Sequence, residues 1–83
     1  MLTRLQKGKK LVGLRQSQKA VASGMALEAF VAGDADLRIA AGFLQLCEKH
    51  GIPVFHVKTM SELGRACGIG IGAGFAVLVK ESD

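Results

Sequence analysis

Aromatic residues and long apolar runs are scarce in this 83-residue chain, which has no tryptophan or tyrosine and four phenylalanines. A surface that stacks many bases of a single strand needs aromatic rings, so the composition argues against that class of protein. No apolar run reaches the length needed to cross a membrane. The N-terminus also lacks the apolar core and small-residue cleavage site of a signal peptide. We therefore expect a cytoplasmic protein.

Cysteine is also rare, and Cys47 and Cys67 form no C-x-x-C pair. His50 and His56 do not complete the set of ligands, at the required spacing, of a zinc site. Both stand among apolar residues, which predicts small buried side chains in a reduced compartment. We expect neither a metal nor any other cofactor.

Acidic residues are absent from the first 27 positions, which carry a net charge of +6. Residues 28–83 carry −2, so the total of +4 hides a strong asymmetry. A basic N-terminal third on a chain with a pI of about 9.4 favours a polyanion, most often nucleic acid. An ordinary solubilising face remains an alternative. The six basic residues of this third are Arg4, Lys7, Lys9, Lys10, Arg15 and Lys19.

Residues suited to catalysis do not gather in the sequence. Asp34 and Asp36 stand near a turn, where they can cap a helix. The glycine-rich run 68–74 fits G-x-G-x-x-A spacing, but it follows a predicted helix and precedes a strand, the reverse of a dinucleotide site. The run is either a flexible connection or a loop that lies close to a ligand, with Ile69 and Ile71 as exposed apolar tips. We expect a non-enzymatic binding protein.

Helical and strand patterns alternate along a chain that is 49% hydrophobic, which predicts one globular domain over residues 1–83. Alternation of this kind predicts a three-layer α/β/α sandwich. The predicted helices cover residues 2–8 and 15–23, a segment from 37 that ends before Gly51, and about 60–67. The predicted strands are 11–14, 26–32, 54–57 and 75–79, and residues 80–83 should fray.

The clearest helical pattern starts at Leu37, and its apolar face is wide. Leu37, Ala40, Ala41, Leu44 and Cys47 follow helical spacing, and Ile39, Phe43 and Leu46 widen the face. In the preceding helix, the inward residues are expected to be Ala20, Val21 and Ala22. Thr59 and Glu62 have the spacing of a capping box for the last helix.

The stretch from Gly13 to Lys19 connects a short apolar run to a predicted helix. A helix that begins here directs free backbone N–H groups at whatever lies in front of it, which favours an anion. Arg15, Gln16 and Lys19 are three or four residues apart and can share one exposed face. Two cations and an amide suit a phosphate backbone with a base edge beside it. A solvated helix start remains equally open from this stretch alone.

Four stretches resemble, in the same order, one known family. Gly13–Ala20 resembles the G-x-N-E-x-x-K-A signature of the kink-turn RNA-binding ribosomal proteins, the archaeal "L-seven-Ae" type. Leu63–Ile69 resembles that family's L-G-x-A-x-G-[IV] segment. Ala32–Asp36 resembles its A-x-D-A/V-[DE] turn, and Leu46–Val54 its L-C-E-x-x-x-[IV]-P stretch. The match spans roughly residues 10–79, and the short chain is most similar to stand-alone bacterial homologues.

The resemblance implies a four-stranded mixed sheet between helices and a monomer that binds RNA. The implied target is a kink-turn, an RNA helix bent at a bulge beside tandem sheared G·A pairs, in ribosomal RNA or a structured mRNA element. In the family the signature helix enters the major groove at the G·A pairs, and a glycine-rich loop covers the extruded bulge nucleotides. The RNA-binding residues implied here are Gly13, Leu14, Arg15, Gln16, Lys19, Asp36, Arg65, Ile69, Gly70 and Ile71.

Two positions depart from the family signature: Arg15 replaces Asn and Gln16 replaces Glu. A neutral amide oxygen accepts a weaker hydrogen bond than a carboxylate. Arg15 adds a fork of donors for guanine edges or phosphate. We expect specificity for the kink to be retained, with affinity that depends more on salt. A non-specific basic nucleic-acid binder and an assembly subunit are the alternatives.

Overall fold

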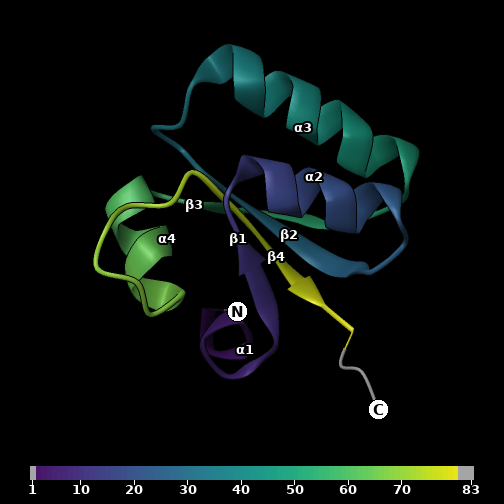
Figure 1. Ribbon diagram of the computed structural model, residues 1–83. Helices are drawn as coiled ribbons and strands as arrows, with labels where there is room; N and C mark the ends of the chain where they lie inside the picture. Colours follow the sequence, from purple (N-terminus) through teal and green to yellow (C-terminus); the bar gives the residue numbers. More distant parts are fainter. Residues whose placement is uncertain (1, 81–83) are drawn as a thin grey trace.

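The computed structural model describes residues 2–80 and contains four helices that alternate with four strands (Figure 1). Helices α2 and α3 cover one face of the sheet, and α1 and α4 cover the other. The predicted three-layer sandwich is therefore confirmed. The elements are α1 (Leu2–Lys7), β1 (Lys10–Val12), α2 (Leu14–Ala22), β2 (Ala26–Ala32), α3 (Leu37–Lys49), β3 (Val54–Val57), α4 (Met60–Ala66) and β4 (Phe75–Val79).

The four strands form one mixed sheet in the order β1-β4-β2-β3. Strand β4, the last in the chain, lies between β1 and β2 and is antiparallel to both. Strands β2 and β3 are parallel. The carboxyl ends of β1, β2 and β3 therefore lie at the same end of the sheet as the start of β4. Four connections of the chain meet at that end.

Apolar side chains from both helix layers fill the core. The Phe43 ring of α3 meets the Phe75 ring of β4 edge to face, with ring centroids 5.2 Å apart. On the other face, Leu5 of α1 and Leu63 of α4 are fully buried. These contacts remove large apolar groups from water, which is the main force that holds so small a domain together.

Cys47 and Cys67 are buried and unpaired, as predicted. Burial raises the pKa of each thiol, because the surrounding apolar groups disfavour the thiolate. Lys10 slightly offsets this effect on the pKa of Cys67. The two side chains therefore contribute to packing.

The boundary between β1 and α2 differs from the predicted one. Strand β1 ends at Val12 rather than residue 14, and α2 covers Leu14–Ala22 rather than 15–23. Gly13 has a φ of 104° and a ψ of 157°, a conformation that leaves the strand before the helix begins. The expected inward position of Ala22 is wrong, because this residue is exposed, whereas Ser17 is fully buried.

The buried stripe of α3 is narrower than predicted. Ala40, Phe43 and Cys47 are buried. The assignment of Leu37, Ile39 and Ala41 to the buried face is wrong, because all three are exposed; Leu37 is 81% exposed and Ile39 43%. The reason is geometric: α3 packs only against one face of the sheet and against α2, so its outer side remains in solvent.

Both predicted helix caps are present at the starts of α3 and α4. The Asp36 carboxylate accepts hydrogen bonds from the backbone N–H groups of Arg38 and Ile39, at 2.9 and 3.2 Å. The Thr59 hydroxyl accepts from the backbone N–H of Glu62 at 3.1 Å. Lys80 does not fray, since its backbone N–H donates to the Met25 carbonyl at 3.1 Å. Residues 81–83, for which fraying was also predicted, lie outside the described part.

Candidate nucleic-acid interface

Three connections lie side by side at the end of the sheet where β4 begins: the start of α2, the turn 33–36 and the loop 67–74. Backbone hydrogen bonds hold them together. The Gly13 N–H donates to the Phe75 carbonyl at 2.8 Å, and the Ala32 N–H donates to the Gly74 carbonyl at 2.9 Å. The Gly33 N–H donates to the Val57 carbonyl at 2.7 Å. Segments more than 60 positions apart in sequence thus share one surface (Figure 1).

The N-terminus of α2 opens onto this surface with its backbone donors uncapped. Gly13 occupies the N-cap position and has no side chain that could accept a capping hydrogen bond. The first turn of the helix contains no acidic residue. The first N–H groups of the helix, with the positive end of its dipole, therefore face outward. Arg15, Gln16 and Lys19 are all exposed, as predicted, whereas Leu14 is half-buried and packs against the core.

The loop 67–74 is held against α4 by close backbone contacts. Gly64 of α4 touches the carbonyl of Ile71, and the Ala73 N–H donates to the Met60 carbonyl at 3.0 Å. Ile71 is 77% exposed, so this apolar side chain projects from the loop as predicted. The prediction of Ile69 as a second exposed tip is wrong, because Ile69 is half-buried and packs against the core. Gly70 between them is exposed.

The turn 33–36 lies next to the loop 67–74 and also contacts the start of α4. The Asp34 carboxylate accepts a hydrogen bond from the Met60 N–H at 2.7 Å and so caps α4 from 26 residues away. Sequence reasoning placed Asp34 among the local caps and missed this contact, because nothing in the spacing links the two positions. Asp36 is exposed and caps α3. Arg65 is exposed in the last turn of α4.

Part of the basic N-terminal third is engaged within the fold. Arg4 forms an ion pair with Glu28 at 2.9 Å and lies over the Phe55 ring, 5.8 Å from its centroid. The Lys10 ammonium donates to the carbonyls of Gln6 and Gly8 at the end of α1, at 3.2 and 3.4 Å. From the sequence, Arg4 and Lys10 are expected to be available to a partner. In the fold, both side chains instead make contacts that hold α1 in place.

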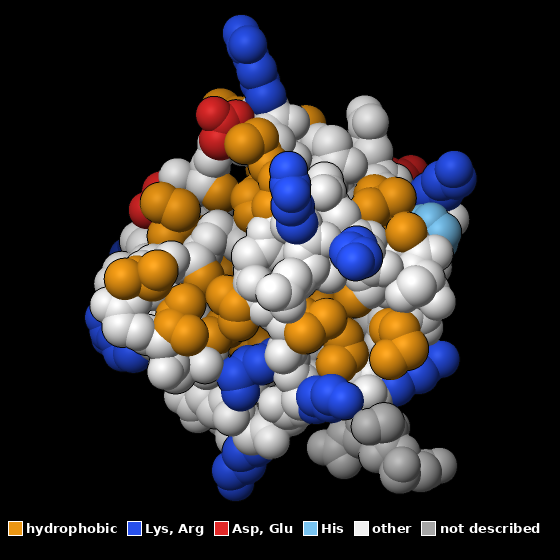
Figure 2. Space-filling model, in the orientation of Figure 1, with side chains coloured by type: hydrophobic (Ala, Val, Ile, Leu, Met, Phe, Trp, Pro, Cys, Tyr) orange, Lys and Arg blue, Asp and Glu red, His pale blue; other side chains and the backbone are white. Residues whose placement is uncertain are grey.

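Basic side chains are spread over the face of the molecule shown in Figure 2, and acidic ones lie only in its upper part. Hydrophobic patches lie between the basic side chains. Within residues 2–80 no cluster of His, Cys, Asp or Glu could hold a metal ion. In the same range, none of the helices combines the length and apolar character needed to span a membrane.

A family model and two relatives with known names all point to the same family of proteins. The model of the "Ribosomal protein L7Ae/L30e/S12e/Gadd45 family" matches residues 2–83. RNA-binding protein YbxF of Geobacillus stearothermophilus is 37% identical over 76 residues, which cover 92% of this chain and 93% of the relative. An RNA-binding protein of Geobacillus sp. strain WCH70 is 38% identical over 76 residues, with the same coverage of 92% and 93%.

A solved structure supports the same assignment. The 15.5 kD RNA binding protein of Giardia lamblia superimposes with a TM-score of 0.90 and is 27% identical; the match covers 98% of this chain and 72% of that chain. The family model spans nearly the whole sequence, and both curated relatives match over nearly their full length. This chain therefore belongs to the ribosomal protein L7Ae/L30e/S12e/Gadd45 family.

Proposed function

We propose that this protein binds RNA through the surface formed by the start of α2, the turn 33–36 and the loop 67–74, and that its specific target is a kink-turn. The curated relatives are named RNA-binding proteins, not enzymes, which supports a non-enzymatic role. The resemblance of Gly13–Ala20 and Leu63–Ile69 to the two RNA-contacting segments of kink-turn proteins supports the finer proposal.

The observation that carries the proposal is the juxtaposition of these two segments. They are fifty residues apart in sequence, yet the Gly13–Phe75 hydrogen bond joins the start of α2 to the strand that follows the loop 67–74. A kink-turn offers two unusual features next to each other, a pair of sheared G·A pairs and a set of extruded nucleotides. The uncapped helix start suits the first feature, and the exposed apolar Ile71 suits the second.

The exposed side chains of α2 differ in which parts of an RNA they can contact. The Gln16 amide can accept from guanine amino groups and donate to base edges. Arg15 can donate to a guanine edge or, with Lys19, to phosphate. An ordinary A-form major groove is too narrow to admit a helix, so base contacts of this type require a distorted and widened site.

A gel-shift titration tests the proposal with two RNAs that differ only in the tandem G·A pairs. Replacement of these pairs by Watson–Crick pairs should abolish tight binding. In the protein, Gln16→Ala should weaken binding to the kink-turn by about tenfold, since a good base contact is worth about 1–3 kcal/mol. Gln45→Ala is the matched control, because Gln45 is exposed in the middle of α3. Equal affinity for the two RNAs would contradict kink specificity.

A further inference from the structure

Arg38 stands in the first turn of α3, at the end of the molecule that carries the proposed RNA surface. Strands β1 and β2 are both antiparallel to β4, so the helices that follow them, α2 and α3, begin at the same end of the sheet. The two helices pack side by side (Figure 1). Each begins with the same two residues, Leu-Arg, so Arg38 is the counterpart of Arg15 on the neighbouring helix. The RNA contacts proposed above give Arg38 no role.

The fold itself does not require a cation at position 38. The positive end of the helix dipole lies at the start of α3, where a second positive charge is unfavourable. The backbone N–H groups of Arg38 and Ile39 are already satisfied by the Asp36 carboxylate, so the Arg38 side chain is not needed to cap the helix. The side chain is exposed, and within residues 2–80 no acidic side chain forms an ion pair with it. The guanidinium is therefore available to a partner.

The charges around the turn 33–36 show why a cation is useful there. Asp34 and Asp36 place two negative charges in the middle of the proposed RNA surface, and both are exposed. Both carboxylates are fixed by backbone N–H groups, which hold them in place. A negative charge at this position repels a passing phosphate. Arg38 lies two residues after Asp36 and supplies a positive charge that offsets this repulsion.

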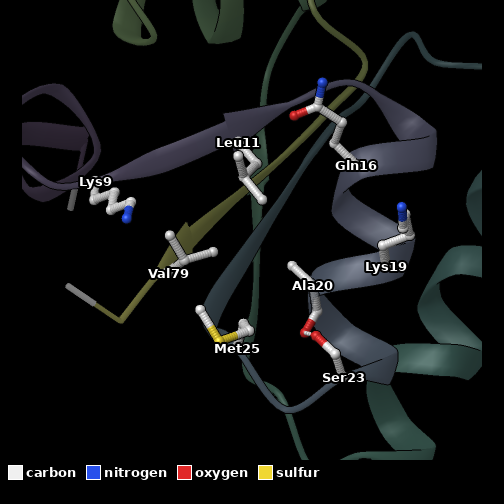
Figure 3. Close-up of a pocket in the computed structure, with 8 residues that line it drawn as sticks. All are labelled: Lys9, Leu11, Gln16, Lys19, Ala20, Ser23, Met25 and Val79. Atoms are coloured by element: carbon white, nitrogen blue, oxygen red, sulfur yellow. Dashed lines mark hydrogen bonds between the residues drawn. The ribbon is translucent and has the colours of Figure 1, made fainter. Parts of the chain in front are cut away.

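Arg38 and Gln16 lie on different sides of α2. Gln16 points from α2 towards β1 (Figure 3), whereas α3 packs on the other side of α2 (Figure 1). The axes of packed helices are about 8–10 Å apart, so Arg15 and Arg38 can reach different phosphates of one RNA. We propose that Arg38 binds a phosphate of the strand that carries the extruded nucleotides, where this strand passes the turn 33–36. A guanidinium suits this contact, because it can donate two parallel hydrogen bonds to a phosphate. This inference rests on the proposed function and extends the RNA footprint to a second helix.

The first test compares Arg38→Gln with Lys49→Gln in binding titrations with a kink-turn RNA. Lys49 is the matched control, because it is exposed in the last turn of the same helix, about 16 Å further along its axis. Arg38→Gln should reduce the slope of log affinity against log salt concentration by about 0.7–0.9, which is one phosphate contact. The affinity at 0.1 M salt should therefore fall about five- to eightfold, and the loss should disappear near 1 M salt. Lys49→Gln should change the affinity less than about twofold, because salt screens a charge at that distance.

The second test locates the phosphate on the RNA. A neutral methylphosphonate replaces one phosphate at a time in the strand that carries the extruded nucleotides. At the contacted position, this change should weaken binding of the wild-type protein by about five- to eightfold. It should weaken binding of Arg38→Gln by less than about twofold, since both changes remove the same contact and their effects do not add.

The outcomes separate this inference from the proposed function. Wild-type affinity and salt slope in Arg38→Gln, on an RNA that the wild-type protein prefers to its Watson–Crick control, would overturn the inference alone. The absence of that preference in the wild-type protein would overturn the proposed function and the inference with it. Equal losses in Arg38→Gln and Lys49→Gln would show a general charge effect and would also overturn the inference. The urea midpoint of Arg38→Gln should equal or exceed that of the wild type, because a cation is removed from a helix N-terminus. A lowered midpoint would assign Arg38 to the fold and overturn the inference.

Discussion

Gly13 determines both where β1 ends and how α2 presents its first backbone donors. Its φ of 104° and ψ of 157° belong to a region that other residues enter only with strain. A side chain at this position would meet no atom within 4 Å, so the requirement for glycine comes from the backbone alone. The sequence pattern placed Gly13 inside a predicted strand, residues 11–14, and only the backbone conformation of this glycine shows that β1 ends before it and α2 begins after it.

Replacement of Gly13 by alanine should therefore destabilise the protein by about 1–3 kcal/mol, the typical cost of such a conformation. Gly42→Ala provides the control. Gly42 lies inside α3, where an added side chain also meets no atom within 4 Å, and alanine there should stabilise by about 0.5–1 kcal/mol. Urea denaturation measures both changes. Equal unfolding free energies for the two variants would contradict the role of backbone strain at Gly13.

The exposure of single residues is predicted reliably from sequence where polarity decides it, and less reliably for apolar side chains. Arg15, Gln16 and Lys19 are exposed because charged and amide groups are costly to bury. Ile69 and Ile71 have the same side chain and similar neighbours, yet one packs against the core and the other projects into solvent. That difference depends on the path of the loop, which local sequence does not encode.

At the scale of elements, strands were predicted more accurately than their connections. Strands β2, β3 and β4 have the predicted bounds, because each is a short and largely apolar run bounded by residues that favour turns. The hydrogen bond from the Met60 N–H to Asp34 and the contact of Gly64 with Ile71 could not be predicted. These two contacts join segments that are distant in sequence. The segments come together only after β3 pairs with β2 and α4 packs against the sheet.

The contact between α4 and the loop 67–74 leads to a prediction about Gly64. An added methyl group would overlap the Ile71 carbonyl, which belongs to the backbone and cannot rotate away. Gly64→Ala should therefore destabilise the fold by about 1–3 kcal/mol, as overpacking does, and should displace Ile71. We expect weaker binding to a kink-turn at a temperature where the variant is still folded. Urea denaturation and a gel shift measure the two effects.

Gly70→Ala serves as the control for folding in the same loop. An alanine side chain at position 70 meets no atom within 4 Å, so the unfolding free energy should change by less than about 0.5 kcal/mol. A Gly64→Ala protein with wild-type stability and wild-type affinity would show that the loop does not depend on its contact with α4.

At the scale of the whole molecule, the fold separates the basic N-terminal third into two groups. Arg4, Lys7 and Lys10 are on α1 or directed towards it, on the face of the sheet opposite α2. Arg15 and Lys19 lie on α2 beside the proposed RNA surface. The alternation of helices and strands predicted the layers, but the strand order β1-β4-β2-β3 was not predictable, because strand pairing depends on contacts across the whole chain. That order decides which cations lie near the interface.

The separation distinguishes a specific kink-turn protein from a general basic binder. The double variant Arg15→Gln/Lys19→Gln should reduce the slope of log affinity against log salt concentration by about 1–2. Each phosphate contact that is lost means that fewer counterions are released from the RNA on binding. Lys7→Gln with Lys10→Gln removes the same charge from the opposite face and should change the slope by less than about 0.5. Binding titrations over a series of salt concentrations measure both slopes. Equal reductions in the two double variants would favour non-specific attraction to the whole basic surface, since only that mode ignores the position of a charge.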